Sequence, residues 1–199
     1  MGTGTLTDLT MAASVNGLVF KVPTFEDHLH GLWRASLATA AFAKEIARSR
    51  RANVETAFLC GRLYAIGRPM LLQMAVEEIK AKGLDLKKPE FRAEILEVVD
   101  ALQIDEGVYV AERWKLPPAV MASIRHNESP AEAGEQQADA ATVGVAKLLA
   151  ANVLAKEPVE NPGVPSEKAL SILNLYQDEI EAIVVRKAAI LEIVNTMTA

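Results

Sequence analysis

The sequence predicts an all-α protein, a compact multi-helix bundle of about eight to ten helices. Two observations support this fold class. Ala, Leu, Glu and Lys, which favour helices, dominate the chain. Short runs of alternating β-branched residues between turns, which are typical of strands, are missing. Half of the 199 residues are apolar and 24% are charged, so the composition is that of a globular protein rather than a disordered one.

The expected helices follow from apolar residues that recur at steps of three and four positions, and from the capping and breaking residues between them. The first helix begins at Thr5 or Thr7 and continues to residue 15. Thr24 is a candidate N-cap for a long helix over residues 25–50. Asn53 caps the helix after it. The remaining helices, beginning with the one that Asn53 caps, are expected at residues 53–67, 69–83, 91–102, 105–114, 117–124, 130–156 and 175–197.

Three prolines and one glycine between residues 157 and 165 predict a linker or surface loop. This loop separates an expected helical core over residues 1–156 from C-terminal helices over residues 166–199, which are expected to pack on the core. The length favours one domain, with two small domains as the alternative. No internal repeat and no low-complexity tract occurs in the sequence.

The chain has 21 lysines and arginines against 26 aspartates and glutamates, giving a formal net charge of −5. This balance argues against broad binding to nucleic acid or to an anionic membrane surface. The N-terminus lacks a cationic start followed by an apolar stretch, and no uncharged apolar run reaches the ~18 residues that suggest a membrane span. We therefore expect a cytoplasmic protein without membrane association. The single cysteine, Cys60, excludes an intramolecular disulfide and is expected to be buried.

Ionisable residues suited to catalysis are scarce. The three histidines are His28, His30 and His126. His28 and His30 are two positions apart, so on a helix they point to different faces and do not easily ligate one metal. His126 lies where one helix ends before the next, a position that the helix dipole favours for histidine. No nucleophile elbow, Walker loop or dinucleotide fingerprint occurs, so the residues alone indicate no catalytic constellation.

Four separated segments carry a more specific pattern. They are residues 32–40 (LWRASLATA), 57–67 (AFLCGRLYAIG), 107–117 (GVYVAERWKLP) and the segment that begins at Ile124. In order and spacing these segments resemble the HDOD family, the bacterial signalling relatives of HD-domain metal-dependent phosphohydrolases. The resemblance extends over about residues 6–155. It implies an HD-like helical bundle and a regulatory role in signal transduction.

The chain departs from the metal-binding pattern of the HD relatives. At the positions of their histidine and aspartate ligands, the resemblance places Ala35, Tyr64, Ala65, Gln103, Asn127, Glu128 and Val143. Alanine and valine supply no donor atom, and a phenol with a pKa of about 10 is a poor ligand at neutral pH. His126 is one position from the expected histidine pair and would restore one ligand but not a set. A di-metal hydrolase needs several converging ligands, so we expect no metal and no cofactor.

Three functions remain open from the sequence. The first is a non-catalytic signalling module that acts through protein–protein contacts. The second is a residual metal-dependent phosphohydrolase or phosphodiesterase that acts on nucleotides and uses His126, Glu128, Asp139 and Gln103. The third is a nucleotide or anion sensor in the vacated pocket of Ala35, Tyr64, Ala65, Gln103, His126, Asn127 and Glu128. The candidate anion donors of such a sensor are Arg34, Arg62, Arg68 and Arg125.

Members of the family usually carry another helical subdomain before the segment that residues 4–15 resemble. The resemblance therefore implies a shortened member, a fragment, or a member whose N-terminal partner lies on another chain. Apolar surface left uncovered in this way favours self-association, so a homodimer is a further expectation. Protein partners from a signalling pathway are expected as well.

Overall fold

The computed structural model describes residues 22, 24–83, 89–155 and 165–198 of the chain. These residues form helices and no strand, which confirms the predicted all-α class. The predicted helix that begins at Thr5 or Thr7 lies outside the described residues. The observed elements are α2 (Glu26–Ser49), α3 (Val54–Leu63), α4 (Gly67–Ala81), α5 (Pro89–Arg113), α6 (Pro118–His126), the 3-10 helices η1 (Pro130–Glu132) and η2 (Gly134–Gln136), α7 (Gln137–Leu154), α8 (Glu167–Leu173), α9 (Gln177–Val184) and α10 (Lys187–Thr198).

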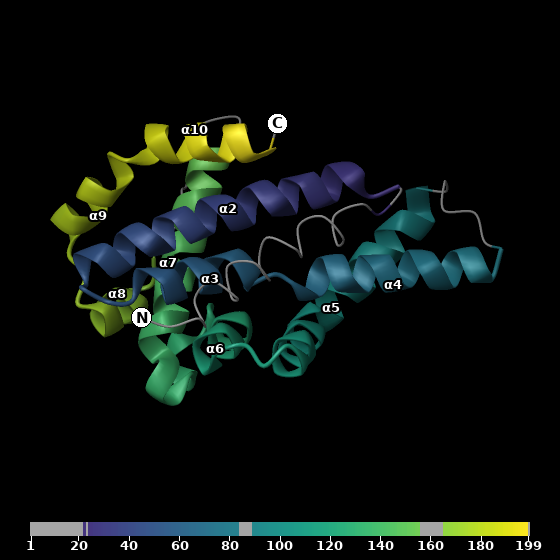
Figure 1. Ribbon diagram of the computed structural model, residues 1–199, viewed down its shortest axis with the longest axis horizontal. Helices are drawn as coiled ribbons and strands as arrows, with labels where there is room; N and C mark the ends of the chain where they lie inside the picture. Colours follow the sequence, from purple (N-terminus) through teal and green to yellow (C-terminus); the bar gives the residue numbers. More distant parts are fainter. Residues whose placement is uncertain (1–21, 23, 84–88, 156–164, 199) are drawn as a thin grey trace.

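Helix α2 occupies the centre of the bundle (Figure 1). It packs along α3 and crosses α7, and α10 covers another side of it. Helices α4 and α5 pack together and extend to one end of the molecule, whereas α8 and α9 lie at the opposite end. Helix α6 packs against α3, α5 and α7, so it links the α4–α5 pair to the rest of the bundle.

Buried apolar side chains form three clusters. The largest joins α2 and α7 to the C-terminal helices and includes Phe42 and Val194. The second lies between α3, α5, α6 and α7 and contains Cys60 and Val143. The third holds the start of α2 against α4 and α5 through residues such as Leu29. The predicted burial of Cys60 is confirmed, and burial raises the pKa of its thiol to about 12.

Helix α5 differs from the two helices expected at residues 91–102 and 105–114. It is one continuous helix that ends at Arg113, so the expected break is wrong. Gln103 and Ile104 continue the helix through the expected break, and Gly107 is buried further along it. A Cβ atom at this position would lie 3.0 Å from Ile124 Cγ2 and 3.4 Å from the backbone nitrogen of Gly67. Close packing against α6 and α4 outweighs the low helix propensity of glycine.

The single helix expected at residues 175–197 is also wrong, because the structure has two shorter helices there, α9 and α10, and a further helix, α8, before them. Ser166 caps α8 by accepting a hydrogen bond from the backbone N–H of Ala169. Asn174 ends α8 with a φ of 47°, a left-handed conformation that asparagine tolerates. The Glu179 carboxylate then accepts a hydrogen bond from the Tyr176 N–H at 3.1 Å and starts α9.

Other boundaries differ from the expected ones as well. Phe25 and not the candidate Thr24 is the N-cap residue of α2, and the helix expected at residues 53–67 ends at Leu63. The helix expected at residues 130–156 begins at Gln137, because Pro130 and the following residues form two 3-10 turns first. The helix expected to begin at Pro69 begins at Gly67, so the proline lies within its first turn, where its missing N–H costs no intrahelical hydrogen bond.

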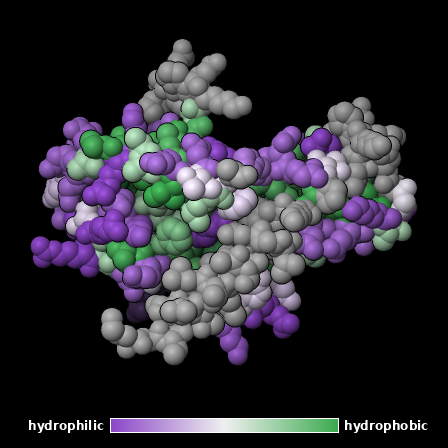
Figure 2. All heavy atoms as spheres, turned by 45° about the horizontal axis from the view of Figure 1, so that its top comes forward, coloured by the Kyte–Doolittle hydropathy of each residue, from purple (hydrophilic) through white to green (hydrophobic). Residues whose placement is uncertain are grey.

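The described surface mixes charged and apolar residues. On the side where α9 and α10 lie, which is turned forward in Figure 2, apolar atoms reach the surface between hydrophilic ones. The exposed apolar residues of these helices and their junction include Val185, Ile193 and Met197. Among the described residues, no helix has the length and the apolar character that crossing a membrane requires.

Candidate functional site

A cleft of about 600 Å³ opens where the turn after α3, the start of α4, the middle of α5, the end of α6 and α7 meet. Asp100 and Lys147 lie in its wall. The cleft also collects most of the residues that the sequence analysis singled out for a pocket: Tyr64, Ala65, Arg68, Gln103, Arg125, Asn127 and Glu128. Segments that are far apart in the sequence therefore meet at one place.

Two of the four candidate anion-binding arginines do not line the cleft. Arg34 binds the end of α10 through hydrogen bonds of 3.1 and 2.9 Å. Arg62 is buried against α2, where it donates a hydrogen bond to the hydroxyl of Ser36, and burial lowers its pKa to about 10. Arg68 and Arg125 are the two candidates that line the cleft.

Four other residues named from the sequence do not line the cleft. Ala35 lies within α2 and Val143 is fully buried in the second apolar cluster. His126 lines a separate hollow, where its Nδ1 atom lies 3.9 Å from Glu132 Oε2. Asp139 lies in the first turn of α7, and burial raises the pKa of its carboxyl group.

His28 and His30 have different surroundings on α2, as their spacing predicts. His28 is half-buried, and burial lowers the pKa of its imidazole. His30 is exposed, and its Nε2 atom lies 3.2 Å from the carbonyl oxygen of Thr198. Within the described ranges, no group of three or more His, Cys, Asp or Glu side chains is placed to hold a metal ion.

One wall of the cleft is a set of contacts between α4 and α5. Arg68 donates from Nε to Gln103 Oε1 at 2.6 Å, and its Nη2 atom lies 2.9 Å from Asp100 Oδ1. The helices approach closely here, because a Cβ atom at Gly67 would lie only 1.9 Å from the carbonyl oxygen of Gln103. Glycine therefore permits the approach that lets Arg68 bind two side chains of α5.

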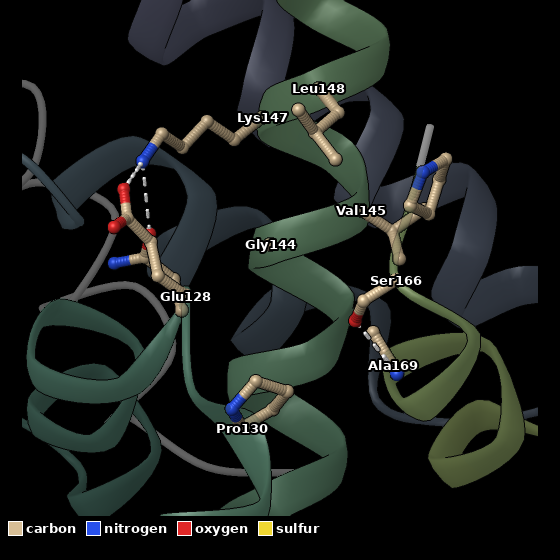
Figure 3. Close-up of a pocket in the computed structure, with 10 residues that line it drawn as sticks. Glu128, Pro130, Gly144, Val145, Lys147, Leu148, Ser166 and Ala169 are labelled. Atoms are coloured by element: carbon tan, nitrogen blue, oxygen red, sulfur yellow. Dashed lines mark hydrogen bonds and ion pairs between the residues drawn. The ribbon is translucent and has the colours of Figure 1, made fainter. Parts of the chain in front are cut away.

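The opposite wall is a set of contacts between α7 and the end of α6 (Figure 3). Lys147 Nζ lies 2.6 Å from Glu128 Oε1 and donates to Asn127 Oδ1 at 3.2 Å. The same side chains border a second cavity of about 290 Å³, which Ser166 and other residues near α8 line on the far side. Lys147 lowers the pKa of Glu128 through its hydrogen bond and its charge.

Close packing also sets the position of this second wall. Asn127 follows α6 and donates its side-chain amide to the carbonyl oxygens of Ser123 and Ile124. A Cβ atom at Gly144 of α7 would lie 2.2 Å from the carbonyl oxygen of Asn127. Only a glycine allows α7 to lie this near to the end of α6, and Lys147 is one helical turn further along α7.

The electrostatic character of the cleft follows from its charged side chains. Arg68, Arg125 and Lys147 supply three cations, against the two carboxylates of Asp100 and Glu128. Tyr64 is half-buried, and burial raises the pKa of its phenol, so the side chain is neutral at physiological pH. The cleft thus holds one more cation than carboxylate, together with amide and hydroxyl groups.

Asp100 and Lys147 are cleft residues that the sequence analysis missed. A helical-period argument identifies both: Asp100 lies three positions before Gln103 on α5, and Lys147 lies four positions after Val143 on α7. Residues three and four positions apart share a helix face, so each of the two was a candidate neighbour of a position already singled out.

The helices and the polar cleft define this chain as an all-α domain with a mixed-charge pocket between four of its helices. A family model described as HDOD domain matches residues 1–130. The chain belongs to the HDOD family. The match includes the cleft residues from Tyr64 to Glu128 and ends before Val143 and Lys147. No significant match was found among curated proteins or among solved structures.

Proposed function

We propose that this chain is a non-catalytic HDOD module that transmits a signal through contacts with other proteins. The observation that carries the proposal is the bonding of the cleft residues. At the positions that match metal ligands of HD enzymes, Gln103 is bound by Arg68, while Asn127 and Glu128 are bound by Lys147. Gln103 and Asn127 are neutral amides that each bind a cationic side chain, whereas a di-metal centre needs several converging histidine and carboxylate ligands.

The remaining positions support the same conclusion. Ala65 and Val143 have no donor atom, and the neutral phenol of Tyr64 is a weak metal ligand. The carboxylates of the cleft, Asp100 and Glu128, each lie against a cationic side chain. The donor set does not fit the di-metal site of a phosphohydrolase, so we derive no hydrolytic step.

The first test measures metal content and hydrolysis together. We expect the protein, purified without chelators or a histidine tag, to hold far less than one equivalent of iron, manganese or nickel by mass spectrometry. We also expect no hydrolysis of cyclic dinucleotides when Mn²⁺ is added. Stoichiometric metal with metal-dependent hydrolysis would favour the residual phosphohydrolase instead, and loss of that activity in Glu128→Gln would assign it to the cleft.

A second candidate function is the sensing of a small anion, such as a nucleotide, in the same cleft. It is favoured by the three cationic side chains Arg68, Arg125 and Lys147, which line one cavity. The ion pair of Lys147 with Glu128 is no obstacle, because the Glu128 side chain is 83% exposed and exposed pairs contribute little to stability. An incoming phosphate would compete with Glu128 for the ammonium group.

Thermal unfolding in the presence of inorganic phosphate or AMP tests this second function. A ligand that binds only the folded state at 100 times its Kd stabilises that state by about 2.7 kcal/mol, which is a readily measured rise in Tm. We expect the rise to disappear in Arg125→Ala/Lys147→Ala. It should persist in Arg34→Ala, since Arg34 binds α10 rather than the cleft. An unchanged Tm with both ligands would exclude the sensor.

A further inference from the structure

Helix α5 exposes apolar side chains on a face that packs against no other described helix. Val98, Leu102 and Tyr109 are 57%, 47% and 56% exposed. They follow each other at steps of four and seven positions, so they lie along one stripe of the helix. The opposite side of α5 buries residues such as Val99 and Ala111. A helix that is apolar on two sides is normally covered on both.

Acidic residues lie beside these apolar side chains on the same face of α5. Glu94, Asp105 and Glu112 are exposed, and each lies three, four or seven positions from Val98, Leu102 or Tyr109; one exposed cation, Arg113, lies four positions from Tyr109, so carboxylates outnumber cations on this face. We call these six residues the α5 stripe: Glu94, Val98, Leu102, Asp105, Tyr109 and Glu112. Asp100 and Gln103, which line the cleft, lie on a different side of α5, so the stripe and the cleft are separate surfaces.

We propose that the α5 stripe binds a basic amphipathic helix of a partner protein. Apolar side chains of that helix would cover Val98, Leu102 and Tyr109, and its lysines or arginines would pair with the flanking carboxylates. A helix fits because an exposed row of side chains on one helix packs into the grooves of another. The inference rests on the proposed function in protein contacts, and it names the surface and the kind of partner.

The charges distinguish this partner from the other possible occupants. If a second copy used the same face about a two-fold axis, the three carboxylates of Glu94, Asp105 and Glu112 would face the same three in the partner, which is repulsive. Nucleic acid is disfavoured for the same reason, because its phosphates would meet carboxylates. A cationic helix has the complementary charge.

The test uses a defined probe, a fluorescent peptide of about 18 residues, which forms about five helical turns. It carries leucine along one face and lysine elsewhere, and a matched peptide carries glutamate in place of lysine. Fluorescence anisotropy with the full chain should show binding of the lysine peptide, and binding of the glutamate peptide should be weaker by about tenfold or more.

Variants then locate the binding. We expect Leu102→Ser/Tyr109→Ser to weaken binding of the lysine peptide by about tenfold or more. Ile193→Ser/Met197→Ser, which removes an equally exposed apolar pair on α10, should leave binding unchanged. We expect circular dichroism and Tm to show that both variants fold, since all four side chains are about half exposed.

Hydrogen exchange and light scattering give the results that would support or overturn the proposed binding surface. Protection by the lysine peptide over residues 94–112 supports the proposal, whereas no binding, or protection confined to another helix, overturns it. A dimer of the free protein that Leu102→Ser dissociates would make a second copy the occupant and also overturn it. The metal and hydrolysis measurements decide the proposed non-catalytic function independently of these results.

Discussion

Substitution of Phe42 by alanine is expected to lower the free energy of unfolding by about 3–5 kcal/mol. Phe42 lies in the middle of α2 and has no exposed surface. Its side chain belongs to the apolar cluster in which α2 and α7 meet α8, α9 and α10. Removal of the ring leaves a cavity between helices that cannot all move inward at once, so both apolar burial and packing are lost.

Urea denaturation followed by circular dichroism measures this effect. Phe58→Ala is the matched control, because Phe58 is half-buried on α3 and lines only a surface hollow. The Phe58→Ala substitution should lower the free energy of unfolding by about 1 kcal/mol. We expect a single transition in the Phe42 variant, since the cluster includes residues on both sides of the segment 157–165. Equal losses for the two variants, or two separate transitions, would contradict a shared core.

Features of the fold that depend on neighbouring residues were predictable from the sequence. Asn53 accepts a hydrogen bond from the Thr56 N–H at 3.0 Å and caps α3 as expected. The long helix α2 follows its apolar period closely and ends within one residue of the prediction. By contrast, Gly107 indicates a weak helix when read locally, but the side chain of Ile124 on α6 requires its small size. That contact is formed only when the helices pack.

The residues of the candidate site were also predictable only in part from the sequence. Tyr64, Gln103 and Glu128 lie at one cleft, and the spacing of the family motifs was the signal that grouped them. Arg34 was grouped with them by its closeness in sequence, yet it lies on the side of α2 that meets α10. Helical spacing places Lys147 on the same face as Val143, but its ion pair with Glu128 joins residues on different helices, and a local pattern does not predict that pairing.

Substitution of Gly144 by alanine is expected to destabilise the protein by about 1–3 kcal/mol, although alanine normally favours a helix interior by up to about 1 kcal/mol over glycine. The new Cβ atom would lie 2.2 Å from the carbonyl oxygen of Asn127, so α6 and α7 must move apart. Gly31→Ala is the matched control on α2, where nothing lies within 4 Å of the new atom. The Gly31→Ala substitution should raise the free energy of unfolding by about 0.5–1 kcal/mol.

The same substitution should change the cleft, because Asn127 and Glu128 bind Lys147 next to the contact that alanine would push apart. Lys147 holds the pKa of Glu128 below its ordinary value, so this pair stabilises the folded state above the unfolded pKa and is lost as the pH falls through the folded pKa. In Gly144→Ala, carboxyl NMR should show the pKa of Glu128 raised toward its ordinary value, with no change in Gly31→Ala. Equal stability and equal Glu128 titration in the two variants would mean that Gly144 does not set the position of this wall.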